Sequence, residues 1–514
     1  MAESDQALAD NVEEDIHPEF ITFRAVLVLL VATLATASYS FTWNAVSIAL
    51  PHMKGTFSAT TDQVTWVMIS YVVGSAMATA SVSWFAGRFG RRRMFLLAIT
   101  GFTLTQFGCA TAATLETEVA WRFVQGVMGA PLIPLTQVIA VNAFPKARYT
   151  QATSLWALGF ILANVVAPTL AGYIIDDFGW PAIFFVTVPI STICLLAGYV
   201  LIPASPRQSK PMDWIGFLSL ILAVGCFQLM ISRGERLDWF YSPEIIAEAI
   251  AAIIFVHTFI VRTILATSPF IDRSLFTDWN FVLGQFCVFA VGMSMFIPLM
   301  LIPLQLQQLG GYPASEIGVL IMARGVGSII SLIFISRMGD KFEPRTLMTF
   351  GLVITAAGTW MMSQWTPDVR ATDVFAANFV MGIAVGSVWA PMNKLALARL
   401  PKRVQDQGFA VFYLVFDMGY AIGTALIIAL FTRHSQIGHA LFAEHISPFN
   451  RGLQSSNAIN GGWDISGVEG LAAIDNEITR QAAAVAFNNS YMVLSVVLLS
   501  IIPILLFFRK RPED

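Results

Sequence analysis

The chain has 514 residues, of which 56% are apolar and 12% are charged. Soluble domains carry about a quarter charged residues, so this composition excludes an ordinary soluble protein. The apolar residues also come in blocks of about 20, enough helix to cross about 30 Å of hydrocarbon. The sequence therefore predicts an all-α integral membrane protein, and the net charge of −3 gives no indication of a nucleic-acid partner.

Residues 1–23 are polar and acidic, and they lack the positive start and early apolar core of a signal peptide. We interpret them as a cytoplasmic tail. The cysteines lie inside apolar segments, which favours small buried side chains over a disulfide or metal framework. They are Cys109, Cys194, Cys226 and Cys287. We expect no cofactor and no metal site.

Fourteen apolar segments have the length of a membrane-spanning helix. They are residues 25–50, 64–86, 94–113, 118–141, 152–175, 182–202, 213–232, 244–266, 280–305, 315–336, 347–364, 373–398, 408–431 and 486–508. With the N-terminus inside, 21 of the 30 Lys and Arg residues fall on one side and seven on the other, while Arg122 and Arg324 lie within spans. This asymmetry follows the positive-inside rule and predicts that both termini are cytoplasmic.

Two short basic loops indicate an internal repeat: "SWFAGRFGRRR" (83–93) follows the second span and "SRMGDKFEPR" (336–345) follows the tenth. Because the offset is eight helices, we expect two six-helix bundles with two inserted helices between them, a known transporter design. The expected domains are the tail, an N-terminal bundle at 24–205, two linker helices at 206–270, and a C-terminal bundle at 271–514 that includes a polar periplasmic loop at 432–485.

Several motifs follow one another on the expected spans. "RFVQGVMGA" (122–130) keeps the pattern Arg-x-x-Gln-Gly-x-x-Gly-Ala, and "LGFILANVVAPTLAGYIID" (158–176) keeps Gly159, Pro168 and Gly172. "GWPAIFFVTVP" and "LDWF" follow at 179–189 and 237–240. In this order the motifs resemble the major facilitator superfamily, specifically its fourteen-span drug:proton antiporter branch of the EmrB/QacA type.

The resemblance implies a proton-coupled multidrug efflux transporter that exports amphipathic and hydrophobic compounds by alternating access. It further implies a multi-pass protein of the bacterial inner membrane whose partners are small-molecule substrates, protons and lipid, with a periplasmic adaptor (membrane fusion) protein and an outer-membrane channel. An exporter of a siderophore, fatty acid or aromatic metabolite is the alternative. We do not expect an enzyme, because no cluster of nucleophilic or metal-binding residues stands out.

Two departures from the family pattern bear on the mechanism. The first basic loop has Gly87 where the family carries an acidic residue, although the second copy keeps Asp340. The first span, "TWNAVSIALP" (42–51), has Thr42 where the branch has an aspartate. Threonine cannot titrate, so a proton-carrying role in the first helix is in doubt.

Proton coupling needs a group that gains and loses a proton inside the membrane, and a carboxylate suits this role because burial raises its pKa toward neutrality. Asp417, in the thirteenth span, is the only acidic residue at such depth, and Arg324, in the tenth, is a candidate partner. A fixed ion pair between the two is the alternative. The resemblance implicates Arg122 in coupling, whereas a structural pair with Glu118, four residues earlier, is the alternative there.

In the resembled family the first and fourth helices of each half line the central cavity. The corresponding spans offer Trp43, Asn44, Gln125, Gln137, Gln285, Met293, Met295, Phe296, Asn378, Trp389 and Asn393 as substrate contacts. Such aromatic, methionine and amide surface suits bulky amphipathic molecules, although these residues could instead face lipid or pack between helices. Conformational roles fall by resemblance on Arg88, Gly90, Arg92, Gly126, Gly129, Gly159, Pro168, Gly172, Asp340 and Arg345, with positive-inside anchoring as the alternative for the basic loops.

The polar segment 432–485 contains His434, His439 and His445, which lack a metal-ligand spacing and are expected to be solvated. Because the EmrB type works with a periplasmic adaptor, this segment is also the expected docking region.

Overall fold

The computed structural model describes residues 21–145, 148–204, 212–397, 399–447, 453, 463 and 467–509. All regular secondary structure within these residues is helical and no strand occurs there, which confirms the all-α prediction. The predicted tail at 1–23 lies almost entirely outside the described residues. The four cysteines are free, and all except the half-buried Cys226 are buried, as expected for small apolar side chains.

Each apolar segment predicted as a span coincides with one helix or with two consecutive helices. The first eight segments form α2 (Phe23–Thr56), α3 (Thr61–Phe89), α4 (Arg91–Ala110), α5 (Leu115–Gly129) with α6 (Leu132–Asn142), α7 (Tyr149–Phe178), α8 (Ala182–Leu201), α9 (Trp214–Arg233) and α10 (Pro243–Leu265). The last six form α12 (Trp279–Met295) with α13 (Pro298–Gln308), α14 (Ala314–Met338), α15 (Pro344–Met362), α16 (Ala371–Leu397), α17 (Lys402–Ala443), and α19 (Val468–Ser500) with α20 (Ile502–Leu505). The connections contain the short helices η2 (Trp239–Tyr241), α11 (Ser274–Thr277) and η3 (Gly339–Lys341).

Twelve helices in the described part of the chain are long and apolar enough to cross a membrane. The remaining two predicted spans, α4 and α15, are not in this group. Both nevertheless lie within the bundle, because α4 packs against α5 and α8 and α15 packs against α16 and α19. The chain is therefore a multi-pass membrane protein.

The same helix packing occurs twice along the chain. α2 contacts α7 and α8, α3 contacts α5, and α4 contacts α5 and α8. In the same order, α12 contacts α17 and α19, α14 contacts α16, and α15 contacts α16 and α19. This correspondence defines two helix groups, the first from α2 to α8 and the second from α12 to α19. Each group contains one of the two similar basic loops.

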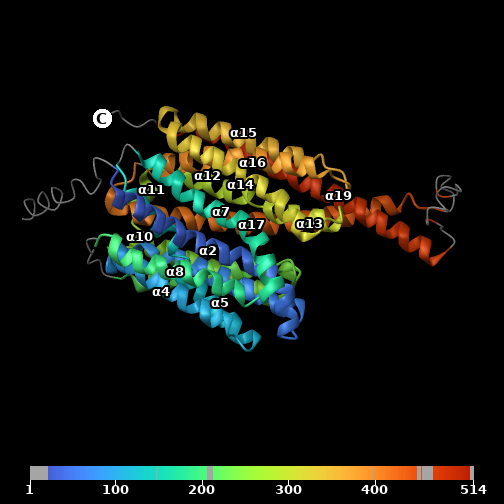
Figure 1. Ribbon diagram of the computed structural model, residues 1–514, viewed down its shortest axis with the longest axis horizontal. Helices are drawn as coiled ribbons and strands as arrows, with labels where there is room; N and C mark the ends of the chain where they lie inside the picture. The colour runs from blue at the N-terminus through green and yellow to red at the C-terminus, as the bar shows by residue number, and fades with distance from the viewer. Residues whose placement is uncertain are drawn as a thin grey trace, which may run out of the picture.

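The two groups meet through α7, which contacts α14 and α16, and through α17, which contacts α3 and α6. Figure 1 shows α7 and α17 between a group containing α2, α4, α5 and α8 and a group containing α12, α14, α15 and α16. The inserted helices α9 and α10 pack on each other, and α9 also contacts α3 and α17. Ion pairs join the two inserted helices, from Arg262 Nε to Asp213 Oδ1 at 2.9 Å and from Arg233 to Glu248 Oε1 at 2.7 Å.

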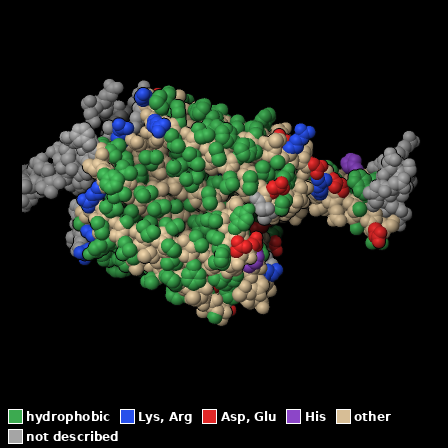
Figure 2. All heavy atoms as spheres, in the orientation of Figure 1, with side chains coloured by type: hydrophobic (Ala, Val, Ile, Leu, Met, Phe, Trp, Pro, Cys, Tyr) green, Lys and Arg blue, Asp and Glu red, His purple; other side chains and the backbone are tan. Residues whose placement is uncertain are grey.

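On the face that Figure 2 shows, the charged side chains lie mainly at the two ends of the bundle. In Figure 2 apolar side chains cover most of the middle of the visible face, Lys and Arg gather at one end, and most Asp and Glu lie toward the other. We call the first of these the basic end; it holds the connections from α3 to α4 and from α14 to α15. An apolar middle between charged ends is what a lipid bilayer requires.

The prediction of a loop across 432–485 is wrong over most of the segment. α17 continues to Ala443 and α19 already begins at Val468, so two helices leave the bundle side by side, as Figure 1 shows. His439 Nε2 and Asp475 Oδ1 lie 3.0 Å apart between them. The polar composition predicts a loop, but seven of the 30 helical residues in the segment are Ala, the strongest helix former, and a helix outside the membrane needs no apolar run.

Candidate functional site

Arg122 is fully buried. It is the first member of a series of hydrogen-bonded side chains that links three helices. Its Nη1 donates to Gln125 Oε1, and its guanidinium lies over the Tyr71 ring, 4.0 Å from the ring centroid. Gln125 Nε2 donates to Gln106 Oε1 at 2.9 Å, and Gln106 Nε2 donates to Thr42 Oγ1 at 3.0 Å. The series thus links α5 through α4 to α2, and it satisfies amides that would otherwise be costly inside the bundle.

The ion pair between Glu118 and Arg122, which was the structural alternative to a coupling role for Arg122, does not form in the described structure. Glu118 is fully buried, its two carboxylate oxygens have no hydrogen-bond partner, and its electrostatic neighbours are Arg122 and the Cys109 thiol. The Arg122 guanidinium contacts Gln125 and Tyr71 instead. In the conformation described, the Glu118 carboxylate is therefore not half of a fixed bridge.

Arg324 and Asp417 do not form a hydrogen bond or ion pair either. Arg324 is 2% exposed, donates from Nη2 to the Met295 carbonyl at 2.6 Å and lies 5.7 Å from the centre of the Phe296 ring. Asp417 is half-buried and acts electrostatically on Tyr39 of α2. A fixed pair between Arg324 and Asp417 is therefore absent from the conformation described.

Arg122 and Arg324 lie at equivalent helix crossings of the two groups, α3 with α5 and α14 with α16, but on different members of each helix pair. A Cβ added at Gly126 of α5 would lie 2.2 Å from the Tyr71 carbonyl oxygen of α3, and one added at Gly382 of α16 would lie 2.2 Å from the Arg324 carbonyl oxygen of α14. Tyr71 and Arg324 thus hold equivalent positions in the repeat. The first group carries its cation on the fourth helix, whereas the second carries it on the second helix.

Three predicted substrate residues meet between the helix groups. Gln137 Nε2 of α6 donates to Asn393 Oδ1 of α16 at 3.2 Å, and the Tyr413 hydroxyl of α17 donates to Gln137 Oε1. The Trp389 ring stacks on the Phe160 ring of α7, with 6.4 Å between the ring centroids, and lies tilted to the Tyr413 ring, with 6.0 Å between the centroids. These side chains close the interface from both sides in the conformation described.

The other predicted substrate residues are not gathered in one place. Trp43 lies edge-on to Tyr71 at 5.3 Å, and Asn44 Nδ2 donates to an asparagine of α7 at 2.6 Å. Met293 lies against α17 at a close helix crossing, and Asn378 is fully buried in α16. The Gln285 amide is buried without a hydrogen-bond partner, so it remains available to a polar ligand.

The predicted conformational residues of the basic loops bond within their own helix group. Arg92 donates to the Tyr199 carbonyl of α8, and Arg345 donates to the Phe508 carbonyl. Arg88 is exposed, and Gly90 has a φ of 86°, a conformation suited to glycine where α4 begins. The Asp340 side chain lies outside the described residues.

The predicted conformational glycines of α5 and α7 differ in what surrounds them. Gly129 faces Tyr39 and Phe102, and Gly159 faces Thr33, so both permit close packing, whereas Gly172 has open space and shares α7 with Pro168. Their roles in conformational change stay predictions.

Gly126→Ala is expected to lower the free energy of unfolding by about 1–3 kcal/mol, because its Cβ would meet backbone atoms that cannot move aside. Gly172→Ala is the matched control: with nothing within 4 Å, it is expected to be neutral or to stabilise by up to about 1 kcal/mol. Thermal unfolding of both purified variants in detergent measures the difference. Equal stability of the two would contradict the close crossing of α3 and α5.

The structure also brings forward residues that sequence reasoning missed. Tyr413 stands one helical turn before Asp417 on the same face of α17, a spacing that the sequence alone contains. Trp156 is fully buried and donates to the hydroxyls of Thr36 and Thr136 at 3.1 and 3.0 Å. Its partners lie 120 and 20 residues away, so nothing local could indicate them.

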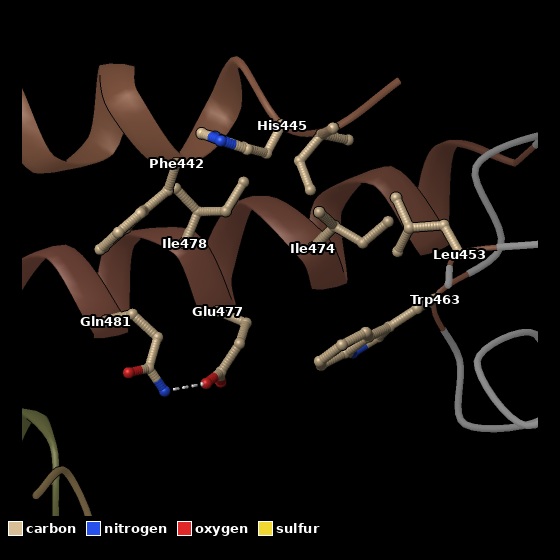
Figure 3. Close-up of a pocket in the computed structure, with 9 residues that line it drawn as sticks. Phe442, His445, Leu453, Trp463, Ile474, Glu477, Ile478 and Gln481 are labelled. Atoms are coloured by element: carbon tan, nitrogen blue, oxygen red, sulfur yellow. Dashed lines mark hydrogen bonds between the residues drawn. The ribbon is translucent and has the colours of Figure 1, made fainter. Parts of the chain in front are cut away.

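A pocket of about 320 Å³ lies outside the bundle, where the end of α17 meets the start of α19. Figure 3 shows Phe442 and His445 on one side, Ile474, Ile478 and Glu477 on α19, and Trp463 beside them. It shares no residue with the interface between the helix groups. Apart from Glu477, Gln481 and His445, the side chains that line it are apolar.

Two similarly packed helix groups that meet around buried charged, amide and aromatic side chains have the architecture of a secondary transporter. A profile of the Major Facilitator Superfamily matches residues 32–286 and 284–443. The chain therefore belongs to the major facilitator superfamily.

Relatives and solved structures agree with this assignment. The multidrug export protein EmrB of Haemophilus influenzae is 29% identical over 490 residues, covering 95% of this chain and 96% of that protein. The fatty acid resistance protein FarB of Neisseria gonorrhoeae is 29% identical over 462 residues, covering 89% and 91%. The proton:xylose symporter XylE shares the fold with a TM-score of 0.60 at 12% identity, over 94% of this chain and 97% of that one. The resemblance to an EmrB-like permease is thereby confirmed.

Proposed function

We propose that the protein is a proton-coupled multidrug efflux transporter that exports amphipathic and hydrophobic compounds by alternating access. The observation that carries this proposal is the meeting of ionisable, amide and aromatic side chains from both helix groups at one interface, around Asp417, Tyr413 and Gln137. Similarity to multidrug export proteins along nearly the whole chain supports the substrate class.

Proton coupling falls on four buried or half-buried charges: Arg122, Glu118, Arg324 and Asp417. We assign the proton-carrying step to the two carboxylates, because arginine stays charged in proteins. Arg122 and Arg324 supply positive charge to opposite helix groups. Charges at this depth are costly, so their presence favours a functional role.

The remaining predicted residues have supporting roles in the proposal. We assign substrate contacts to Trp43, Asn44, Gln125, Gln137, Gln285, Met293, Phe296, Asn378, Trp389 and Asn393. Their mixture of aromatic, amide and thioether groups suits chemically varied amphipathic molecules. We assign roles in close helix packing and in conformational change to Gly126, Gly129, Gly159, Pro168, Gly172 and the basic-loop residues Arg88, Gly90, Arg92, Asp340 and Arg345.

We further propose that all fourteen predicted segments span a bacterial inner membrane, with both termini and the basic end in the cytoplasm. The N-terminal bundle occupies 24–205, the linker helices 206–270 and the C-terminal bundle 271–514. The basic end supports this orientation through the positive-inside rule. The extensions of α17 and α19 would then reach the periplasm, where an adaptor protein leading to an outer-membrane channel would contact them.

Transport into inverted membrane vesicles tests the proposed function. Under an imposed pH gradient, the vesicles are expected to accumulate cationic dyes, uncouplers or fatty acids, and collapse of the gradient is expected to abolish accumulation. Vesicles that lack the protein provide the control. Accumulation that persists after the gradient has collapsed would contradict proton coupling, and no accumulation of any compound class would contradict efflux.

A further inference from the structure

A bridge of hydrogen-bonded side chains joins the two helix groups near the basic end. It runs from Tyr413 through Gln137 to Asn393, with the Gln137 amide bonded on both sides. Asn393 also donates to the Trp389 carbonyl at 2.9 Å, which fixes the direction of its own amide. Gln137 lies five residues from the end of α6 and Asn393 four residues from the end of α16, so the bridge spans the helix groups at one end of the bundle.

An aromatic layer packs beside this bridge. The ring centroid of Trp389 in α16 lies 6.4 Å from that of Phe160 in α7 and 5.3 Å from that of Phe416 in α17. The ring centroids of Trp156 in α7 and Tyr413 are 6.4 Å apart. Trp389 is 3% and Trp156 0% exposed. The layer excludes water, and a hydrogen bond in a dry setting is stronger than one in water. Bridge and layer together close the basic end.

Asp417 stands directly beyond this closure. It follows Tyr413 by one turn of α17, and Phe416, its immediate neighbour, packs on Trp389. The bridge and the layer therefore lie between the half-buried Asp417 carboxylate and the start of α17 at Lys402.

The surroundings of Asp417 contain few groups that could titrate in its place. Tyr413 on its own helix and Tyr39 on α2 are its ionisable neighbours. Tyr39 is bonded to Ser75 of α3 at 2.8 Å, and among the described residues no arginine, lysine, histidine or further carboxylate acts on Asp417 from the helices packed on α17. The charge at this point thus depends on Asp417 alone.

We propose that the Tyr413–Gln137–Asn393 bridge is a gate at the basic end that stays closed while Asp417 is ionised and opens after Asp417 takes up a proton. Alternating access requires the opposite end to close when the basic end opens, and closure there would bury Asp417. Burying an ionised carboxylate is far more costly than burying a neutral one, so the charge holds the gate shut. This inference rests on the proposed role of Asp417 in proton coupling.

Cysteine cross-linking at the basic end tests the gate without altering the bridge. A Cβ added at Gly339 would lie 3.0 Å from Thr150 Cγ2, so Thr150→Cys with Gly339→Cys, in a chain whose native cysteines are replaced, places two thiols across the helix groups. Oxidative cross-linking in membranes is expected to be efficient in basic buffer and to fall in acidic buffer. Asp417→Asn is expected to give weak cross-linking at every pH, since the neutral side chain mimics the protonated state.

Tyr413→Phe removes the bridging hydroxyl and keeps the ring. It is expected to lower the closed-to-open ratio in basic buffer about fivefold, the effect of losing one buried hydrogen bond. Tyr491→Phe is the matched control, because Tyr491 is fully buried in α19 and its hydroxyl has no partner. Gln137→Leu provides a second disruption if Tyr413→Phe is poorly folded, and thermal unfolding of each variant identifies such a case.

Cross-linking that is equal at every pH would overturn the gate, as would an unchanged pH dependence in Asp417→Asn or equal behaviour of Tyr413→Phe and Tyr491→Phe. The measurement needs neither substrate nor gradient. A pH-dependent cross-link that is lost in Asp417→Asn, in a protein that exports nothing, would therefore support the gate and contradict efflux, whereas proton-driven export with an invariant cross-link would do the reverse.

Discussion

Asp417→Asn is expected to abolish export driven by a pH gradient, lowering its rate by at least about 100-fold, the lower end of what a positioned proton-transfer group contributes. Asparagine has the shape of aspartate but cannot release a proton. Asp417 is half-buried, acts electrostatically on Tyr39 of the opposite helix group and has no ion-pair partner among the described residues, so its loss breaks no bridge. Dye transport into inverted vesicles, measured across a range of pH, provides the readout.

Asp417→Glu is the control for this prediction. It keeps a titratable carboxylate and is expected to retain export with a displaced pH dependence. Full gradient-driven export by Asp417→Asn, with the pH profile of the unmodified protein, would show that another group carries the proton. Glu118 is then the next residue to replace, because its carboxylate is fully buried without a hydrogen-bond partner.

Arg122→Ala is expected to abolish export and to lower the free energy of unfolding by about 2–3 kcal/mol, because a buried amide loses a charged donor. Gln125 Oε1 accepts from Arg122, and the carboxylate of Glu118 would remain buried without the nearby positive charge. The ring of Tyr71 would also lose the guanidinium that lies 4.0 Å from its centroid. Thermal unfolding and vesicle transport measure the two effects separately.

Two further variants make the Arg122 result specific. Arg433→Ala removes an exposed arginine of α17 and is expected to change stability by no more than about 0.5 kcal/mol. Arg122→Lys keeps the charge but lacks the planar fork that donates to Gln125 while covering Tyr71, so partial export is expected. An Arg122→Ala protein that folds stably and exports at the normal rate would contradict a role in coupling.

The helices were predictable because the signal that forms them is local. A run of about 20 apolar residues must become a helix in lipid, where every backbone group needs an internal partner. The same reasoning failed at 432–485, since a helix outside the membrane leaves no apolar run, and α17 and α19 extend well into that segment. α4 and α15 lie between these cases, because the sequence predicted both as spans, yet they are not among the twelve described helices that are long and apolar enough to cross a membrane.

The candidate site was predictable in its members but not in its contacts. The sequence alone singled out Arg122, Arg324 and Asp417, since a charge within an apolar span is costly and therefore informative. It left fixed ion pairs open as alternatives, because sequence spacing shows which side chains share a helical face but not what faces them from another helix. Arg122 bonds Gln125 rather than Glu118, and no ion pair joins Arg324 to Asp417.

The amino-acid sequence thus determined the class of protein, its helices and the charged residues of interest, all of which depend on composition and local order. Only the tertiary structure decided the bridge from Tyr413 through Gln137 to Asn393, whose members stand up to 276 residues apart. It also decided the equivalence of Tyr71 and Arg324 at the two glycine crossings. Such contacts depend on how packed helices face one another, a relation that no single helix carries in its own sequence.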